Sequence, residues 1–227
     1  MGLFFAITII LVWAGHLFYI LNYVALNPAS PMMYLHILIQ TYLFTGLFIT
    51  AHDAMHRTVS RAKWLNTGIG FFSLMLYAGM WYPKLLKNHH LHHEYPGTKD
   101  DPDYYTGSQN FWIWWATFMF RYLTIAQFII MAIFYNLLNI WFDTASLWVF
   151  WILPAILSTL QLFYFGTYLP HRRPHDENME PHKARTQKKN HLWAMISCYF
   201  FGYHYEHHEA PWTPWWQLYK AKSKPAK

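Results

Sequence analysis

Cysteine and charge are both scarce in this sequence. Its 227 residues include a single cysteine, Cys198, and only 12% are Asp, Glu, Lys or Arg. One cysteine excludes an internal disulfide and any metal site built from a cluster of thiolates. The chain is instead 55% hydrophobic and 21% aromatic, which is rich even for the core of a soluble domain. The composition favours a membrane protein.

Four long runs of the sequence contain no Asp, Glu, Lys or Arg. They cover residues 2–26, 31–51, 122–142 and 144–170. A helix that spans a bilayer needs about 20 predominantly apolar residues, so each run is long enough. A fifth run, 64–82, is shorter and rich in glycine, which favours a re-entrant or interfacial hairpin. We therefore expect an all-α integral membrane protein with about four transmembrane helices and this short hairpin, as a single domain over residues 1–227.

Lysine and arginine are missing from two of the expected loops. None of the 17 precedes Arg57, and none lies between Arg121 and Arg172. Apart from Arg121, they gather in the segments 57–99, 172–189 and 220–227. By the positive-inside rule these segments face the cytoplasm, where they contact anionic lipid headgroups. The net charge of +6 is explained by this topology, and no separate basic domain is present to bind nucleic acid.

Histidine is abundant where charge is scarce. His16 and His36 fall inside expected spans, where we interpret them as hydrogen-bonded core or interface residues, and the rest of the 15 histidines fall on the cytoplasmic side. Three sets have helical spacing: His52 and His56 at i, i+4, and then His89, His92 and His93, and His204, His207 and His208, at i, i+3, i+4. Each set shares one helix face. Eight imidazoles exceed the four ligands of one zinc site, which predicts two metal ions in a cytoplasmic histidine-rich cap.

The residues alone leave the metal open, because imidazole binds Zn, Cu, Fe and Ni alike. Carboxylates lie between the histidines, and we expect most of them to accept the second ring N–H of a ligand and so fix its tautomer. The candidates are Asp53, Glu94, Asp100, Asp101, Asp103, Glu206 and Glu209. For Glu209 a solvated position on a loop is an equal alternative.

The order of these motifs resembles the membrane-bound fatty acid desaturase and hydroxylase superfamily. Within it, the strings "FITAHDAMH", "PGTKDDPDYY", "LQLFYFGTYLPHR" and "FGYHYEHHEAPWTPWWQL" look like the β-carotene ketolase (4,4′-oxygenase) family. The resemblance runs from about residue 40 to residue 218. One departure is Arg57, since such ketolases usually carry glycine at that position.

The resemblance implies a di-iron centre that uses O2, with no further catalytic side chain. Its iron ligands would be His52, His56, His89, His92, His93, His204, His207 and His208, with His171 as an additional ligand. His182 is then a candidate to support a ligand, together with Asp53, Asp100, Asp101, Asp103 and Glu206. His90 falls between motif positions, and we expect His175 and His191 at the surface.

The implied activity is O2-dependent oxidation of the allylic C4 methylene of carotenoid β-ionone rings to a 4-keto group. β-Carotene would become echinenone and canthaxanthin, and zeaxanthin would become astaxanthin as a further case. The carotenoid would enter from the bilayer, and a ferredoxin with its reductase would deliver electrons. Aromatic residues are candidates to line a substrate groove, although an interfacial belt is the favoured role: Trp81, Tyr82, Phe111, Trp112, Trp114 and Trp115.

The sequence leaves three alternatives open. A carotenoid 3-hydroxylase or a fatty acid desaturase would share the metal site and differ in the substrate groove. A non-catalytic membrane metal or haem carrier would want facing histidines inside the spans. A zinc-dependent membrane hydrolase would need an open zinc position and a general base, and would act without O2.

Overall fold

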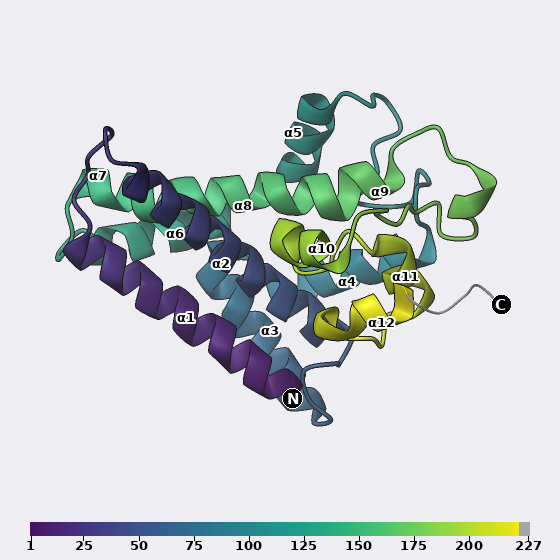
Figure 1. The fold of residues 1–227 in the computed structure, drawn as a ribbon, viewed down its shortest axis with the longest axis horizontal. Helices are drawn as coiled ribbons and strands as arrows, with labels where there is room; N and C mark the ends of the chain where they lie inside the picture. Colours follow the sequence, from purple (N-terminus) through teal and green to yellow (C-terminus); the bar gives the residue numbers. More distant parts are fainter. Residues whose placement is uncertain (223–227) are drawn as a thin grey trace.

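The first two uncharged runs form long helices that pack against each other (Figure 1). In the computed structural model, which describes residues 1–222, α1 spans Gly2–Tyr23 and α2 spans Pro31–Met55. Pro31 lies in the first turn of α2, where the missing backbone N–H has no helical partner to lose. Both helices are long and apolar enough to cross a bilayer, as predicted.

A third candidate span is one continuous helix of 28 residues, Thr144–His171. Asp143 begins it by accepting a hydrogen bond from the N–H of Ser146 at 2.9 Å. Its parts are α7 (Thr144–Leu147), η1 (Trp148–Ile152), α8 (Leu153–Phe163), η2 (Tyr164–Tyr168) and α9 (Leu169–His171). The segments η1 and η2 are π-helical turns, and each lies just before a proline, Pro154 or Pro170. Because a proline ring collides with the carbonyl four residues earlier, the wider turn lets the helix continue.

The uncharged run 122–142 does not form the single span that the sequence predicts. The chain forms α5 (Phe111–Tyr122) and α6 (Ile125–Leu138), which bend by 87° between them. Thr124 accepts a hydrogen bond from the N–H of Gln127 at 3.2 Å, so a new helix begins there. With 14 residues, α6 is about 21 Å long, too short to cross a hydrocarbon core of about 30 Å. The described residues contain three straight candidate spans, or four if the bent pair is one.

Residues 64–82 do not form the predicted hairpin, because they contain one helix. α3 spans Lys63–Ala78, packs along α2 and ends at Gly79, whose φ of 62° is left-handed. Inside α3, Gly70 lies so close to the ring of Tyr82 that a Cβ would be 2.2 Å from it. The glycines at these two positions therefore allow close packing and a helix end.

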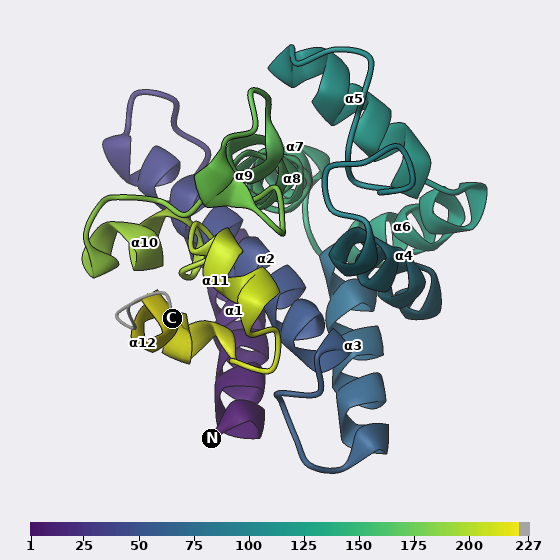
Figure 2. The same ribbon diagram turned by 90° about the vertical axis from the view of Figure 1, so that its right-hand side faces the viewer.

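Short helices gather at one end of the molecule, where α2 and the 144–171 helix also end (Figure 1 and Figure 2). They are α4 (Tyr82–Glu94), η3 (Glu177–Met179), α10 (His191–Cys198), α11 (His204–Glu209), η4 (Trp215–Gln217) and α12 (Leu218–Lys222). This cap carries the histidine-rich segments. The two loops without lysine or arginine lie at the opposite end, on the left in Figure 1. The fold therefore separates a histidine-rich end from an end whose two loops carry no lysine or arginine, and residues 1–222 contain helices and no β-strand.

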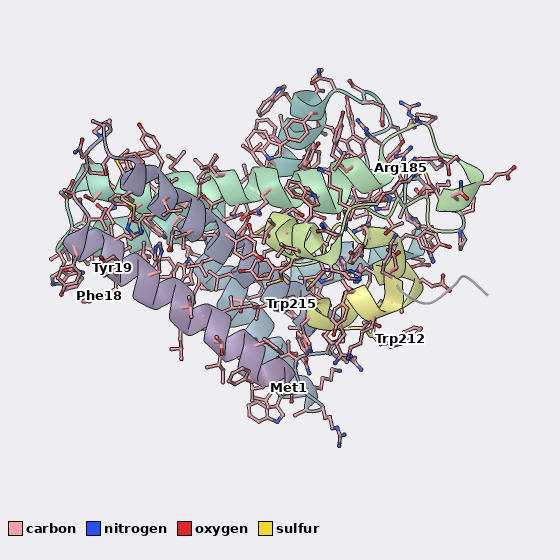
Figure 3. All side chains as sticks on the ribbon, viewed as in Figure 1. Met1, Phe18, Tyr19, Arg185, Trp212 and Trp215 are labelled. Atoms are coloured by element: carbon pink, nitrogen blue, oxygen red, sulfur yellow. The ribbon has the colours of Figure 1, made fainter. Side chains whose placement is uncertain are left out.

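The tryptophan-rich segment after α11 is tied back to the first two helices. Trp215 is buried, packs edge-on against Phe5 with ring centroids 5.7 Å apart, and donates its backbone N–H to the Asp53 carboxylate at 3.3 Å. Figure 3 places Trp215 towards the centre and Trp212 at the periphery, where Trp212 is 72% exposed. Trp215 therefore fixes one side of the cap against α1 and α2.

His16 and His36 pair between the first two helices. Nε2 of His16 lies 3.2 Å from Nδ1 of His36, and Nδ1 of His16 lies 2.5 Å from Oε1 of Gln40. These two histidines are half-buried and hydrogen-bonded at the interface between the helices, as predicted, and they join α1 to α2.

Candidate metal centre

The first group of converging histidines joins three helices. His52 and His56 lie at the end of α2, His89 and His93 on α4, and His207 on α11. The Nε2 atoms of His56 and His89 are 2.6 Å apart, and those of His93 and His207 are 3.0 Å apart. One ring nitrogen from each of the five lies within 4.8 Å of the others. The four-residue spacing on α2 and on α4 brings each pair to one helix face.

The second group has four histidines, all of them buried. His92 comes from α4, His171 from α9, and His204 and His208 from α11. Nε2 of His208 lies 3.1 Å from the Nε2 atoms of both His92 and His204. The ring of His171 meets that of His204 edge-on, with centroids 4.9 Å apart. As in the first group, the four ring nitrogens lie within 4.8 Å of one another.

The two groups are neighbours because α4 and α11 contribute to both. The rings of His93 and His208 stack with their centroids 4.3 Å apart, one from each group. Together the groups contain all nine histidines selected from the sequence, and no other described residue. Sets of five and four imidazole nitrogens suit two metal ions, because neutral imidazole is a common metal ligand and no thiolate is near. The structure thus has a histidine site able to hold metal.

Hydrogen bonds at the outer ring nitrogens set which nitrogen each ring offers to a metal. His92 donates Nδ1–H to Asp101, whose two carboxylate oxygens each lie 3.0 Å away, and its Nε2 faces the second group. His171 likewise donates Nδ1–H to the carbonyl of Lys183 at 3.0 Å, and its Nε2 is buried with no hydrogen-bond partner in the described chain. A buried polar atom without a partner is costly, and a metal ion in the group would satisfy it.

Burial keeps most of these imidazoles neutral. It lowers the pKa of His93 to about 2, with nearby histidines adding to the effect, and it lowers the pKa values of His207 and His208 well below the usual value. His92 is the exception: burial lowers its pKa, but Asp101 outweighs this effect and raises the pKa to about 9. Metal binding requires a free nitrogen, so a metal would replace the Nε2 proton of His92 and leave the Nδ1 proton shared with Asp101.

The predicted supporting residues take several different positions. Asp101 contacts a histidine of the site, as described above. Asp53 lies 3.9 Å from Nδ1 of His52, beyond hydrogen-bond distance, and accepts from the N–H of Trp215 instead. Asp103 accepts a hydrogen bond from the hydroxyl of Tyr122.

The remaining candidates lie farther from the ligands or at the surface. Asp100 is exposed, and Glu206 forms an ion pair with Lys222 at 3.4 Å. His182 pairs with Glu209 at 2.8 Å, and its ring centroid lies 5.6 Å from that of His208. The pairing gives Glu209 a specific partner at the edge of the second group.

The other cap histidines lie outside both groups. His90 and His191 are exposed. His175 is half-buried, and its Nε2 lies 2.8 Å from the carbonyl oxygen of His171. Neither this contact nor the hydrogen bond from His171 to the Lys183 carbonyl could be predicted, because no sequence pattern indicates which backbone carbonyls of an irregular loop will accept hydrogen bonds.

A cavity of about 430 Å³ lies between the helices and reaches the histidines. His52, His89, His92 and His204 line it where the two groups lie. The rest of the wall comes mainly from apolar side chains of α3, α5, α6 and α8, including the bend at Leu123 between α5 and α6. A largely apolar pocket of this size, ending at a cluster of metal-ligating groups, fits part of a long apolar ligand.

Only one of the six aromatic candidates for a substrate groove lines this cavity, and that is Trp115. Trp81 and Trp112 are 58% and 61% exposed, which agrees with the favoured role in an interfacial belt. Tyr82 and Trp114 are buried elsewhere. Phe111 packs against Phe163 with ring centroids 5.5 Å apart.

Comparison with known proteins gives relatives over most of the chain. A sequence profile of fatty acid desaturases matches residues 29–138 and 120–226. A zeaxanthin 4-ketolase of Chlamydomonas reinhardtii is 40% identical over 80% of this chain and 42% of its own length. A beta-carotene ketolase of Paracoccus sp. is 38% identical over 78% of this chain and 74% of its own length. A beta-carotene 4-ketolase of Protosiphon botryoides is 35% identical over 96% of this chain and 62% of its own length.

The chain therefore spans less than half of the Chlamydomonas protein and about three quarters of the Paracoccus one. No solved structure matches the chain significantly.

Proposed function

Because this chain belongs to the fatty acid desaturase family, we propose that it is a membrane carotenoid ketolase with a histidine-ligated di-iron centre. It oxidises the C4 methylene of a carotenoid β-ionone ring to a ketone. The observation that carries this proposal is the convergence of nine histidines into two adjacent groups at one end of an apolar cavity. The names of the relatives, which are ketolases of β-carotene or zeaxanthin, supply the reaction and the substrate class.

The two groups would hold one iron ion each. The first is His52, His56, His89, His93 and His207, and the second is His92, His171, His204 and His208. Bound iron supplies O2 activation and cleavage of an unreactive C–H bond, which no side chain can perform alone. The protein supplies imidazole nitrogens, one of them oriented by Asp101, and it buries all four histidines of the second group.

The overall reaction consumes O2 twice. In the first round the C4 methylene, O2, two electrons and two protons give a C4 alcohol and water. A second round at the same carbon gives a geminal diol, and loss of water from the diol leaves the ketone. The electrons come from an external donor, and we propose a ferredoxin with its reductase acting at the cytoplasmic face.

The cavity binds and orients the ring. Apolar side chains such as Phe48, Leu162 and Phe163 make up most of its wall. Burial of the hydrocarbon ring and its polyene against these side chains drives binding. Met119 and Phe128, on either side of the bend between α5 and α6, also line it. A carotenoid dissolved in the bilayer would enter between these helices and place C4 beside the histidines.

The test is expression of the gene in a bacterium that accumulates β-carotene, followed by chromatography and mass analysis of the pigments. We expect echinenone and canthaxanthin, and we expect both to be absent when His207→Ala is expressed at the same level. Unchanged β-carotene in aerated cells that contain the iron-loaded protein would overturn the proposal.

The alternatives within the same chemistry give different products in the same experiment. A 3-hydroxylase would give 3-hydroxy carotenoids without ketones, and a desaturase would change the fatty acid profile and leave the pigments unchanged. The ketolase names of the relatives favour the C4 ketone.

A further inference from the structure

An acidic and a phenolic side chain form a polar pair in the wall of the apolar cavity. Asp103, in the loop before α5, and Tyr122, the last residue of α5, both line the cavity. The Tyr122 hydroxyl donates a hydrogen bond to Oδ1 of Asp103. Among residues 1–222, no side chain or backbone group donates a hydrogen bond to Oδ2 of Asp103. The pair therefore keeps acceptor capacity for a group that enters the cavity.

The loop around Asp103 is held from several sides. The backbone N–H of Asp103 donates to Asp101 at 2.8 Å, and its carbonyl accepts from the indole N–H of Trp114 at 2.9 Å. Arg121 donates to the carbonyls on either side, those of Pro102 and Tyr104, at 2.8 and 2.7 Å. Arg121 thus fixes the backbone of this loop on both sides of Asp103. Such fixed backbone contacts hold the carboxylate in one position.

The pair lies beside the histidines. Asp101 accepts a hydrogen bond from His92 and another from the backbone of Asp103, so it joins a histidine of the second group directly to the loop. His92 and Asp103 line the same cavity. A ring placed with its reacting carbon at the histidines would have its substituents within the reach of this loop.

We propose that Asp103 and Tyr122 bind a hydroxyl group on the carotenoid ring and so hold the alcohol made in the first round for the second. This inference rests on the proposed ketolase function. The alcohol O–H donates to the free oxygen of the Asp103 carboxylate, which Tyr122 holds in place. An alcohol in an apolar cavity costs free energy unless it has such a partner, so without the pair it would leave before it becomes a ketone.

A hydroxyl at C3 offers the same chemistry, because C3 is bonded to the reacting C4. The pair would then also accept rings that carry a 3-hydroxyl group when they enter. Burial raises the pKa of Asp103 to about 6, which still leaves the carboxylate mostly ionised at neutral pH and able to accept. The C4 alcohol and a C3 hydroxyl present the same group to the pair, a hydroxyl on the ring. An experiment distinguishes them by whether the cells supply β-carotene or a 3-hydroxylated carotenoid.

The test compares Tyr122→Phe, Asp103→Asn and Asp103→Leu with the wild type in cells that accumulate β-carotene. The measured quantity is the ratio of 4-hydroxy to 4-keto products. We expect Asp103→Leu to raise this ratio about fivefold or more, which is the effect of one lost hydrogen bond. Tyr122→Phe should raise the ratio in the same direction, because the Asp103 carboxylate loses the group that holds it in place. Asp103→Asn keeps an acceptor oxygen, so it should fall between these variants and the wild type. Tyr104→Phe, which removes a hydroxyl from the same loop outside the cavity, should leave the ratio unchanged.

Iron content separates this role from a merely structural one, because loss of iron lowers both products together. If Tyr122→Phe lowers the total product but leaves the ratio of 4-hydroxy to 4-keto products unchanged, the inference is overturned. Tyr122→Phe removes a single oxygen, so it decides the question if Asp103→Leu does not fold. In a second arm the cells accumulate a 3-hydroxylated carotenoid. A selective loss of its conversion of about fivefold assigns the pair to the C3 hydroxyl, and no effect in either arm overturns the proposal.

The same experiment distinguishes this inference from the function on which it rests. If the wild type makes no ketone, the ketolase proposal fails. If the wild type makes ketone and the variants give the wild-type ratio, only the role of the pair fails.

Discussion

Asp101 holds His92 in one orientation: each of its carboxylate oxygens lies 3.0 Å from Nδ1 of the ring. The opposite nitrogen, Nε2, lies 3.1 Å from Nε2 of His208. The same carboxylate accepts a hydrogen bond from the backbone N–H of Gly97 at 2.8 Å, so it also fixes the turn that follows α4. One buried acid thus links the fold of a loop to the aim of a proposed metal ligand.

Replacing Asp101 with asparagine should weaken the second group without emptying the first. An asparagine has nearly the same shape, but it has no charge and can present an NH₂ group to Nδ1, which permits the wrong tautomer of His92. Loss of such a partner typically costs about 10- to 100-fold in metal affinity or activity. We expect Asp101→Asn to retain less iron and to lose ketone product by this factor. Iron content of the purified protein and pigment analysis measure the two effects, and Asp100→Asn, at an exposed position, is the control.

Two adjacent histidines on α4 provide a matched pair of variants. His89 belongs to the first group, with Nε2 2.6 Å from that of His56, whereas His90 is exposed. His89→Ala should abolish ketone formation and lower the iron content, because the first group loses a ligand. His90→Ala should retain both. Equal losses in the two variants, measured at equal protein levels, would contradict the assignment of His89 as a ligand.

The histidines that share a helix face can be predicted from the sequence, because helical spacing is a local property. His89, His92 and His93 lie on one face of α4 whatever the rest of the chain does. Which histidine joins which group depends on how α4 packs against α11: His93 goes to the first group and His92 to the second. Spacing alone carries no information on that division.

The bend between α5 and α6 had a local signal that hydropathy hides. An uncharged stretch reads as one span, but Thr124 and Gln127 follow the S/T-x-x-E/Q pattern of a helix start, and Thr124 does cap α6. The glycines near residue 70 led to the opposite error, a predicted break in a helix that is continuous. They suggested a turn, whereas Gly70 accommodates the ring of Tyr82 against an unbroken helix. The cavity depends on both features, so its wall could not be derived from the sequence.

A half-buried amide connects the helices that position the last histidine segment. Thr45 of α2 donates to Oε1 of Gln161 at 2.5 Å, and Nε2 of Gln161 donates to the carbonyl of Ser197 in α10 at 2.7 Å. Gln161→Leu leaves the Ser197 carbonyl without this hydrogen bond, which costs about 1–3 kcal/mol. The Thr45 hydroxyl still donates to the carbonyl of Thr41 at 3.2 Å, so its loss is smaller. We expect a lower melting temperature in detergent and a parallel loss of iron. A melting temperature equal to that of the wild type would show that this link does not hold α10.

Gly166 allows an aromatic ring to lie against the histidines. A Cβ at this position would be 2.4 Å from Cε1 of Phe201, and the Phe201 ring lies edge-on to His52 with centroids 4.8 Å apart. Gly166→Ala should therefore push the ring towards His52 and reduce ketone formation, since overpacking of this kind costs about 1–3 kcal/mol. Gly68→Ala is the matched control, because a Cβ there meets no atom within 4 Å.

A double-mutant cycle tests whether the collision between Gly166→Ala and the Phe201 ring is the cause of that loss. Phe201→Leu replaces the rigid ring with a smaller side chain that can move away from an alanine at position 166. We expect the double variant to form more ketone than Gly166→Ala alone, although Phe201→Leu by itself lowers activity by loosening the cavity wall. Residues in contact show such coupling, whereas independent sites have additive effects. Additive losses in ketone yield would mean that Gly166 acts through a different neighbour, such as the π-helical turn in which it lies.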